Sequence, residues 1–385
     1  MNKYTNRILI TLCEKLQLSD SLYELAEQRY HTIADIIENA PVMKGVSLNM
    51  YAHGSFRLKT TVKPLKGEEY DLDFVVEIAI DNEDDMTPTE LYNHIYDILS
   101  NDGIHNTMVE KKNRCIRVNY ANDFHMDIMP GKQINAGTKE IIVPDKELKY
   151  WYHHSNPIRY AEWFEEQAKT QIITEINQMR KVQCSTEPIE EHEIVARLEP
   201  LRRAVQLIKR YRDIYCDKHN TASVRSIIIC TLMGHITSSY SDELQIIMDF
   251  CSYVSVLAAE SGGEPFEVRN PVVNEVLSEK WIEDTQNYKD FISMTEALKK
   301  DIHRLSALNI NSDINTLLKE MFGETVTNDA IKEYAKSIGV QRDKGNLSVD
   351  SAGRLNISNE GKYSLQGTTQ GRYQTGGVPP VRFSM

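Results

Sequence analysis

Residues 70–78 have the sequence YDLDFVVEI, in which acidic and apolar side chains alternate at the start. Successive side chains of a β-strand point to opposite faces, so Asp71 and Asp73 are predicted on one face. β-Branched and aromatic residues also favour a strand over a loop. We therefore predict a strand that exposes two carboxylates and packs its other face on a core. The core-facing residues are Leu72, Phe74, Val76 and Ile78.

A second pair of alternating segments, residues 115–120 and 124–129, predicts a hairpin further along the chain. The Ala-Asn-Asp sequence between them favours a turn, and Pro130-Gly131 is expected to end the second strand. Phe124, Met126 and Ile128 are predicted to point inward, and His125 and Asp127 outward. If this hairpin pairs beside strand 70–78, three carboxylates converge. The alternative for Asp127 is an ordinary exposed aspartate.

Converging carboxylates repel one another, and divalent cations that also hold a polyphosphate relieve that repulsion. Upstream, residues 53–56 (HGSF) predict a tight turn. Gly54 would let backbone N–H groups approach a phosphate, and the Ser55 hydroxyl would add a donor. Asp-x-Asp alone is not specific, because it also occurs in solvated loops and in glycosyltransferases that hold a sugar nucleotide through a metal. The combination indicates a site for nucleotidyl transfer.

The order of these motifs resembles that of the bacterial cGAS/DncV-like nucleotidyltransferases (CD-NTases) of the DNA polymerase β-like superfamily. The interval between Ser55 and Asp71 is longer than in minimal nucleotidyltransferases, and this length fits the cyclic-oligonucleotide branch. The resemblance extends over about residues 1–335. It rests on residues 54–57 (GSFR), 60–64 (TTVKP), 67–73 (GEEYDLD), 156–164 (NPIRYAEWF), 201–213, 226–232, Asn270-Pro271 and Trp281.

The resemblance implies an enzyme that condenses NTPs into a cyclic di- or trinucleotide second messenger with release of pyrophosphate. Such enzymes serve anti-phage (CBASS) operons. The resemblance further implies two Mg²⁺ ions, with Mn²⁺ as a substitute, near the attacking hydroxyl and the leaving pyrophosphate. The implied catalytic and metal-binding residues are Asp71, Asp73 and Asp127, and the implied nucleotide-binding residues are Gly54, Ser55, Lys209 and Ser226.

Two of these residues have simpler interpretations. The helix predicted over residues 201–215 has a buried apolar stripe, and Lys209 belongs to its charged remainder, which is ordinarily a solvated face. Ser226 precedes a very apolar stretch, where a serine commonly serves as an N-cap. Only the family resemblance assigns the triphosphate to these two residues.

Composition excludes several classes of protein. The chain has 385 residues and a net charge of -12, which argues against constitutive nucleic-acid binding. Its six dispersed cysteines suggest neither a zinc ribbon nor a disulfide framework. No apolar run approaches the roughly 20 residues of a membrane span, so the cytoplasm is the expected location. His153-His154 is predicted to lie in a polar loop rather than at a metal.

The predicted fold class is α+β, a two-lobed polymerase β-like nucleotidyltransferase with a mixed-sheet catalytic core and a helical lobe. An N-terminal spine helix, capped at Ser19, is expected to link the lobes. We predict a catalytic core with N-terminal helices over residues 1–150, a helical nucleotide-binding lobe over 151–340 and a mobile tail over 341–385. The tail is either a functionless extension or a segment, residues 373–385, captured by an operon-encoded accessory protein.

Three functional classes therefore compete. The first is a cyclic oligonucleotide synthase, the second is a nucleotidyltransferase that modifies tRNA, a protein hydroxyl or a small molecule, and the third is a nucleotide-binding scaffold. A scaffold would not require all three carboxylates. The sequence leaves open the bases, ring size and linkage of the product, the activation signal and the oligomeric state, because a few side chains in the pocket decide base choice.

Overall fold

The structure is a computed structural model of the chain. It describes residues 3–65, 69–79, 86–120, 124–135, 137–145, 152–169, 185–186, 199–236, 243–349 and 355–357. The chain divides into two compact units, residues 1–336 and 337–385, which are described separately.

The larger unit contains an eight-stranded mixed sheet with the order β3-β4-β5-β2-β1-β8, to which β6 and β7 are added beside β5. β2 and β5 are parallel, as are β1 and β8, and the other pairs are antiparallel. The strands are β1 (Leu48–His53), β2 (Tyr70–Ile78), β3 (Val109–Lys111), β4 (Ile116–Tyr120), β5 (Phe124–Asn135), β6 (Glu140–Pro144), β7 (Tyr152–Ser155) and β8 (Ser185–Thr186).

The predicted hairpin is present as β4 and β5, but the prediction that Pro130-Gly131 ends it is wrong. β5 continues to Asn135 and pairs with β6 from Lys132 onward. On one edge of β5, pairing with β4 ends at Ile128 and pairing with β6 begins at Lys132, so Pro130 lies between these two ladders. A proline at this position interrupts neither the β4 nor the β6 ladder, although it has no N–H to donate.

Both faces of the sheet carry packed side chains. The predicted apolar face of β2 is confirmed, since Leu72 and Phe74 are buried in a core shared with α2 and α4. The opposite face is open only at its beginning. Val75 packs with Tyr51 under β6, and the Tyr51 hydroxyl donates to Glu77 Oε2 at 2.8 Å. Only the first few residues of β2 therefore leave their carboxylates accessible.

The predicted cap at Ser19 is confirmed, and a glycine ends one of the later helices. Ser19 accepts a hydrogen bond from the Leu22 N–H at the start of α2, and Gly323 ends α11 with a φ of +94°. The helices are α1 (Lys3–Leu16), α2 (Asp20–Glu38), α3 (Gly54–Arg57), α4 (Pro88–Asn101), α5 (Pro157–Ala168), α6 (Pro200–His219), α7 (Ser226–Gly234), α8 (Glu243–Glu260), α9 (Glu279–Glu283), α10 (Thr285–Ala307), α11 (Asn311–Phe322) and α12 (Glu324–Asp343), with a 3-10 turn at η1 (Pro41–Met43).

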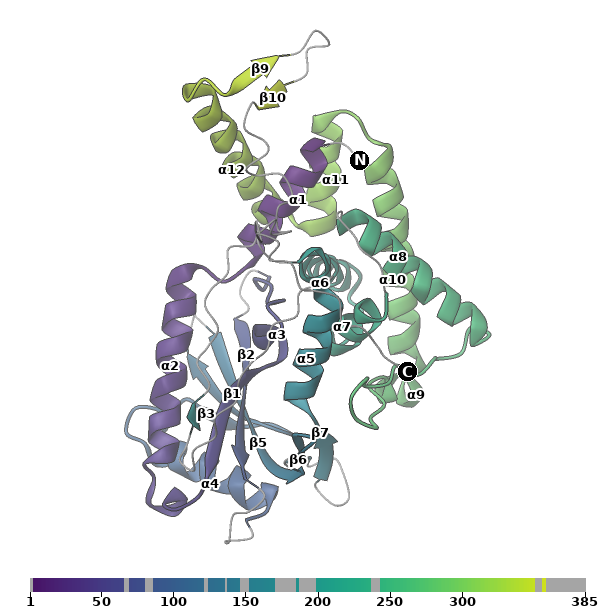
Figure 1. Cartoon of the computed structure of the whole chain (residues 1–385). Coiled ribbons are helices and arrows are strands. Elements are labelled where there is room, and N and C mark those ends of the chain that lie inside the picture. Colours follow the sequence, from purple (N-terminus) through teal and green to yellow (C-terminus); the bar gives the residue numbers. More distant parts are fainter. Residues whose placement is uncertain are drawn as a thin grey trace, which may run out of the picture. The chain divides into compact units, whose positions relative to one another are not determined.

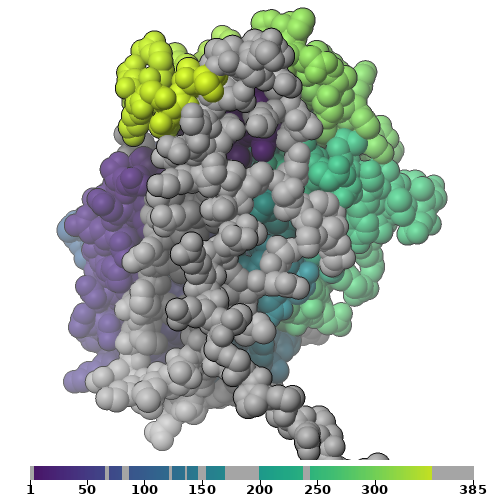
Figure 2. Space-filling model, turned by 45° about the horizontal axis from the view of Figure 1, so that its top comes forward, coloured from purple at the N-terminus to yellow at the C-terminus, as the bar shows by residue number. Residues whose placement is uncertain are grey.

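A second hydrophobic core lies among the helices. It includes the apolar faces of α6, α8, α10 and α11, together with α1. Figure 1 shows α2 along the strands and α6, α7, α8 and α10 gathered apart from them. In Figure 2 the purple mass at the left and the green helical part at the right occupy opposite sides of the visible face. α1 packs with the helices and α2 with the sheet, as expected of a spine. The domain boundaries at 150 and 340 stay predictions.

The tail predicted over residues 341–385 contains two short strands in its described part. β9 (Leu347–Val349) pairs antiparallel with β10 (Leu355–Ile357). The short alternating segments Leu-Ser-Val and Leu-Asn-Ile are compatible with strands although Gly and Ser surround them. Residues 373–385, the proposed captured segment, lie outside the described residues.

Candidate active site

The parallel pairing of β2 with β5 brings the predicted carboxylates together. Asp73 is the register partner of Asp127, and Asp71 is the partner of His125. Neighbouring residues in adjacent strands point to the same face, so Asp71, Asp73 and Asp127 share one edge of the open face. We call these three residues the carboxylate cluster. The hairpin therefore pairs beside β2, which was the condition for the three carboxylates to converge.

The cluster is electrostatically unfavourable by itself. Burial, followed by the charges of Asp127 and Asp71, raises the pKa of Asp73 to about 7, while Lys209 and Arg117 oppose the shift. Burial also raises the pKa of Asp71, against the lowering effect of Arg117. Within the described residues the Asp73 carboxylate has no hydrogen bond or ion pair. Two negative neighbours thus disfavour a charge that nothing in the described protein neutralises directly.

Arg117 is a member of the site that the sequence analysis missed. Its Nε donates to Asp127 Oδ1 at 2.7 Å, and its Nη2 donates both to Asp127 Oδ2 at 2.7 Å and to Asp71 Oδ1 at 3.0 Å. A signal was available, because a hairpin that pairs Tyr120 with Phe124 also places Arg117 opposite Asp127. As the described side chains stand, no three His, Cys, Asp or Glu residues are arranged to hold one metal ion.

Gly54 begins a four-residue helix, α3, directly after β1, where the sequence predicted a tight turn. Its φ is +57°, and a Cβ at this position would overlap Asp73 Oδ2 and lie 2.8 Å from Asp73 Cγ. Only glycine therefore fits against the carboxylate, both by conformation and by space. Ser55 follows at the start of α3 and is partly exposed. Lys66 and Gly67, between this helix and β2, lie outside the described residues.

The simpler interpretation of Lys209, in which it belongs to a solvated face, is wrong because the side chain is buried. The charged face of α6 is buried, and four of its side chains donate to backbone carbonyls of residues 58–63. Lys209 Nζ donates to Thr60 O at 2.9 Å, and burial lowers its pKa to about 8. The other three donor and acceptor pairs are Arg202 with Leu58, Gln206 with Thr61 at 3.1 Å, and Arg210 with Lys63 at 3.2 Å.

Ser226 is the first residue of α7 and not its N-cap, which is Arg225. The predicted capping role is therefore wrong by one residue. The Ser226 hydroxyl accepts a hydrogen bond from Arg212 Nη1 at 3.1 Å. Lys209 and Ser226 both have protein partners in this structure, and their contact with a nucleotide stays a prediction.

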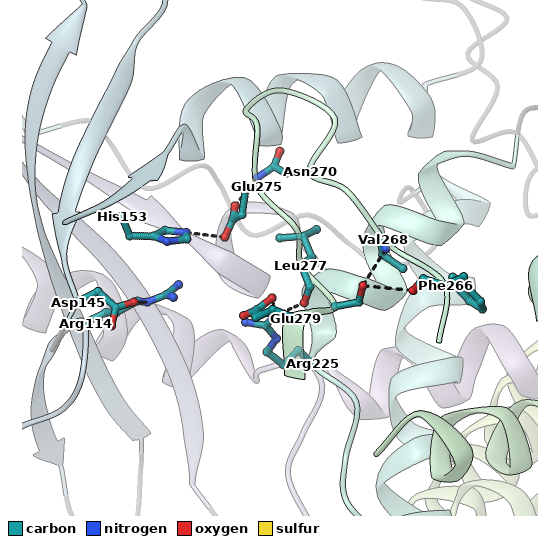
Figure 3. Close-up of polar contacts among 11 residues, drawn as sticks. Arg114, Asp145, His153, Arg225, Phe266, Val268, Asn270, Glu275, Leu277 and Glu279 are labelled. Atoms are coloured by element: carbon teal, nitrogen blue, oxygen red, sulfur yellow. Dashed lines mark hydrogen bonds and ion pairs between the residues drawn. The ribbon is translucent and has the colours of Figure 1, made fainter. Parts of the chain in front are cut away.

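A polar network connects the sheet with the loop before α9 (Figure 3). His153 Nε2 lies 2.7 Å from Glu275 Oε1, and Asn270 Nδ2 donates to Glu275 Oε2 at 2.9 Å. Burial opposes ionisation of Glu275, but these two hydrogen bonds lower its pKa. His153 and His154 lie in β7, so the predicted polar loop is wrong. No described helix is long and apolar enough to cross a membrane.

Comparisons with known proteins identify the family of this chain. A family model described as "Second Messenger Oligonucleotide or Dinucleotide Synthetase domain" matches residues 4–168. A c-di-GMP synthase of Roseivirga ehrenbergii is 30% identical over 358 residues, which cover 88% of this chain and 93% of that protein.

Two solved structures confirm the predicted fold class. The CD-NTase CdnG of Bradyrhizobium diazoefficiens, solved with GTP, has a TM-score of 0.69 at 20% identity and covers 86% of this chain and 100% of its own. The CdnC:HORMA-deltaN complex of E. coli MS115-1 has a TM-score of 0.60 at 12% identity, with coverages of 83% and 96%.

Proposed function

This chain belongs to the Second Messenger Oligonucleotide or Dinucleotide Synthetase family, and from that premise we propose that Asp71, Asp73 and Asp127 carry its chemistry. The protein is a nucleotidyltransferase that condenses nucleoside triphosphates into cyclic nucleotide second messengers. The observation that supports the residue assignment is the parallel register, which sets Asp73 beside Asp127 on an open edge.

The family requires divalent metal ions, and the carboxylate cluster has the oxygen donors that Mg²⁺ prefers. The raised pKa values of Asp71 and Asp73 are the expected sign of a site that lacks positive charge. We therefore assign two Mg²⁺ ions, replaceable by Mn²⁺, to these three residues. When bound, such ions make the attacking ribose hydroxyl more acidic and neutralise charge on the leaving pyrophosphate.

The protein's own groups have distinct parts in this scheme. Gly54 keeps backbone and carboxylate close together, so the donor phosphates bound at Gly54 and Ser55 would lie beside Asp73. The α6 side chains fix residues 58–63, which follow α3 directly. Lys209 and Ser226 would reach the triphosphate only by exchanging their present partners, the Thr60 carbonyl and Arg212.

The product is proposed to be a guanine-containing cyclic dinucleotide, and specifically c-di-GMP. A relative that shares 30% of its residues with this chain is named c-di-GMP synthase, and the structurally similar CdnG was solved with GTP. The resemblance to enzymes of anti-phage operons supports a place in CBASS signalling. Both statements depend on the family and not on a described base contact.

Product analysis tests the assignment. Purified protein is incubated with labelled NTPs, singly and together, in Mg²⁺ or Mn²⁺, treated with phosphatase and analysed by mass spectrometry. We expect a phosphatase-resistant product from GTP alone, which Asp73→Asn abolishes. Asp329→Asn makes the same chemical change on exposed α12 and serves as the control. Linear or macromolecular products would instead support the transferase that modifies tRNA, a protein or a small molecule.

An operon-encoded partner at the C-terminus is also proposed. The complex of CdnC with HORMA gives a precedent in a structurally similar protein. Deleting residues 366–385 should abolish co-purification of an accessory protein encoded in the same operon and leave basal synthesis intact. Unchanged co-purification would refute the proposal.

A further inference from the structure

One atom of Arg117 lies between two carboxylates that come from different strands. Its Nη2 is 2.7 Å from Asp127 Oδ2 and 3.0 Å from Asp71 Oδ1, while its Nε is 2.7 Å from Asp127 Oδ1. The contact with Asp127 is a two-pronged guanidinium–carboxylate pair, which is geometrically the stronger kind. The contact with Asp71 is a single hydrogen bond to a side chain that is 61% exposed.

These two contacts differ in how easily they break. Asp127 is only 14% exposed and is the register partner of Arg117 in the hairpin, so backbone pairing itself holds the two together. Asp71 belongs to β2, which is separated from β4 by β5. A cation that binds the cluster therefore displaces the guanidinium most easily from Asp71, where the guanidinium makes one solvent-exposed hydrogen bond.

We propose that Arg117 is a positioning residue that bridges Asp71 and Asp127 before a divalent ion binds and then releases Asp71 to that ion. In this arrangement Nε remains on Asp127 and keeps its carboxylate oriented. The inference rests on the proposed function, because it takes the cluster to be the metal site. It adds a residue that acts through the ligands and contributes no ligand atom itself.

The electrostatic surroundings support an exchange of cations. Arg117 makes the largest contribution among the positive groups that lower the pKa of Asp71, ahead of His125 and Lys112, and it also opposes the raised pKa of Asp73. The remaining positive contribution at Asp73 comes from Lys209, whose Nζ is already bonded to the Thr60 carbonyl. Removing the guanidinium leaves the three carboxylates with less compensating charge, and a divalent ion is then bound more tightly but the ion-free cluster is less stable.

A purely structural Arg117 predicts something different. If the guanidinium keeps all of its hydrogen bonds when metal binds, only its charge affects metal affinity. Arg117→Lys keeps that charge, so it should then bind metal as the wild type does. The metal affinity of Arg117→Lys therefore separates the two roles, whereas activity alone does not, because both roles predict slower turnover when Asp127 loses its orientation.

The experiment measures Mn²⁺ binding by electron paramagnetic resonance and thermal unfolding in EDTA or Mn²⁺, without nucleotide. Arg117→Gln removes the charge, and Arg117→Lys keeps it but cannot bridge two carboxylates with a planar fork. Arg114→Gln is the matched control, because Arg114 pairs with an aspartate, Asp145, outside the cluster. Figure 3 shows this pair beside His153.

We expect Arg117→Gln to bind Mn²⁺ about tenfold more tightly than the wild type, by loss of a competing unit charge. Its melting temperature should fall in EDTA and recover in Mn²⁺ more than that of the wild type. Arg117→Lys should lie between the two, and Arg114→Gln should lower stability without altering Mn²⁺ affinity.

Equal or weaker Mn²⁺ binding by Arg117→Gln would overturn the inference. Arg117→Lys decides between the two roles, and a Mn²⁺ affinity of this variant no higher than that of the wild type also overturns the inference. These results differ from a failure of the proposed function, in which the wild-type protein itself binds no Mn²⁺ through the cluster. Unchanged Mn²⁺ binding by Asp73→Asn would report that failure, and both proposals would then be rejected.

Discussion

Gly54→Ala adds one methyl group where the backbone comes closest to the carboxylate cluster. The added Cβ would overlap Asp73 Oδ2 and lie 2.8 Å from Asp73 Cγ. Packed carbon and oxygen atoms do not approach closer than about 3 Å, so the Asp73 carboxylate must move by about 1 Å. A misplacement of about 1 Å at a reacting centre costs about 100-fold in rate. We therefore expect about 100-fold slower product formation.

The same substitution also strains the backbone, and Gly45→Ala separates the two effects. Gly45 has a φ of +87°, but a Cβ there meets no atom within 4 Å. Each variant places alanine at positive φ, which costs about 1 kcal/mol and lowers the melting temperature of a unit of this size by about 1–2 °C. Only Gly54→Ala should lose activity, measured as phosphatase-resistant product from labelled GTP. The reasoning is refuted if the two variants are equally active.

Three further predictions concern charge. Asp73→Asn should cut turnover at least about 100-fold without lowering the melting temperature, because it removes a charge that burial disfavours; a large loss of thermal stability would contradict this. Burial opposes ionisation of Glu275, yet His153 and Asn270 lower its pKa below 4.5. Ionised Glu275 therefore stabilises the fold at neutral pH, so the wild type should melt at a higher temperature than Glu275→Gln. This difference in melting temperature should shrink only below pH 4.5. Burial lowers the pKa of Lys209 from 10.5 to about 8, so the unfolded chain binds more protons between these values. Urea unfolding should show wild-type stability rising relative to Lys209→Met from about pH 8 to about pH 10, and a constant difference would argue against a buried Lys209.

Local patterns predicted the parts of the site that lie within single elements. Alternation placed Asp71 and Asp73 on one face of β2 and gave Asp127 its outward orientation in the predicted hairpin. The hairpin register also implied the pairing of Arg117 with Asp127, although the sequence analysis did not draw that consequence. The bridge from Arg117 to Asp71 could not be read in this way, because it depends on β5 pairing with β2, whose residues lie 54 positions earlier in the chain.

Local patterns did not predict the surroundings of the charged face of α6. Helical periodicity correctly separated the apolar stripe from the remainder, but it cannot say whether a second segment covers that remainder. Residues 58–63 do cover it, and their carbonyl groups bind Lys209 and three neighbouring donors. α6 and residues 58–63 lie about 145 residues apart, and nothing in either segment's sequence indicates that they pack together.

The sequence by itself determined the α+β class, the caps and stripes of the helices, and the identity of three carboxylates on separate strand segments. It could do so because alternation, helical periodicity and turn residues act over a few neighbouring positions. Only the tertiary structure decided that β2 and β5 are parallel neighbours, that Arg117 joins Asp71 to Asp127, and that α6 buries its cations against residues 58–63. Those contacts join residues far apart in the chain, and burial of the surrounding surfaces, not local conformation, selects them.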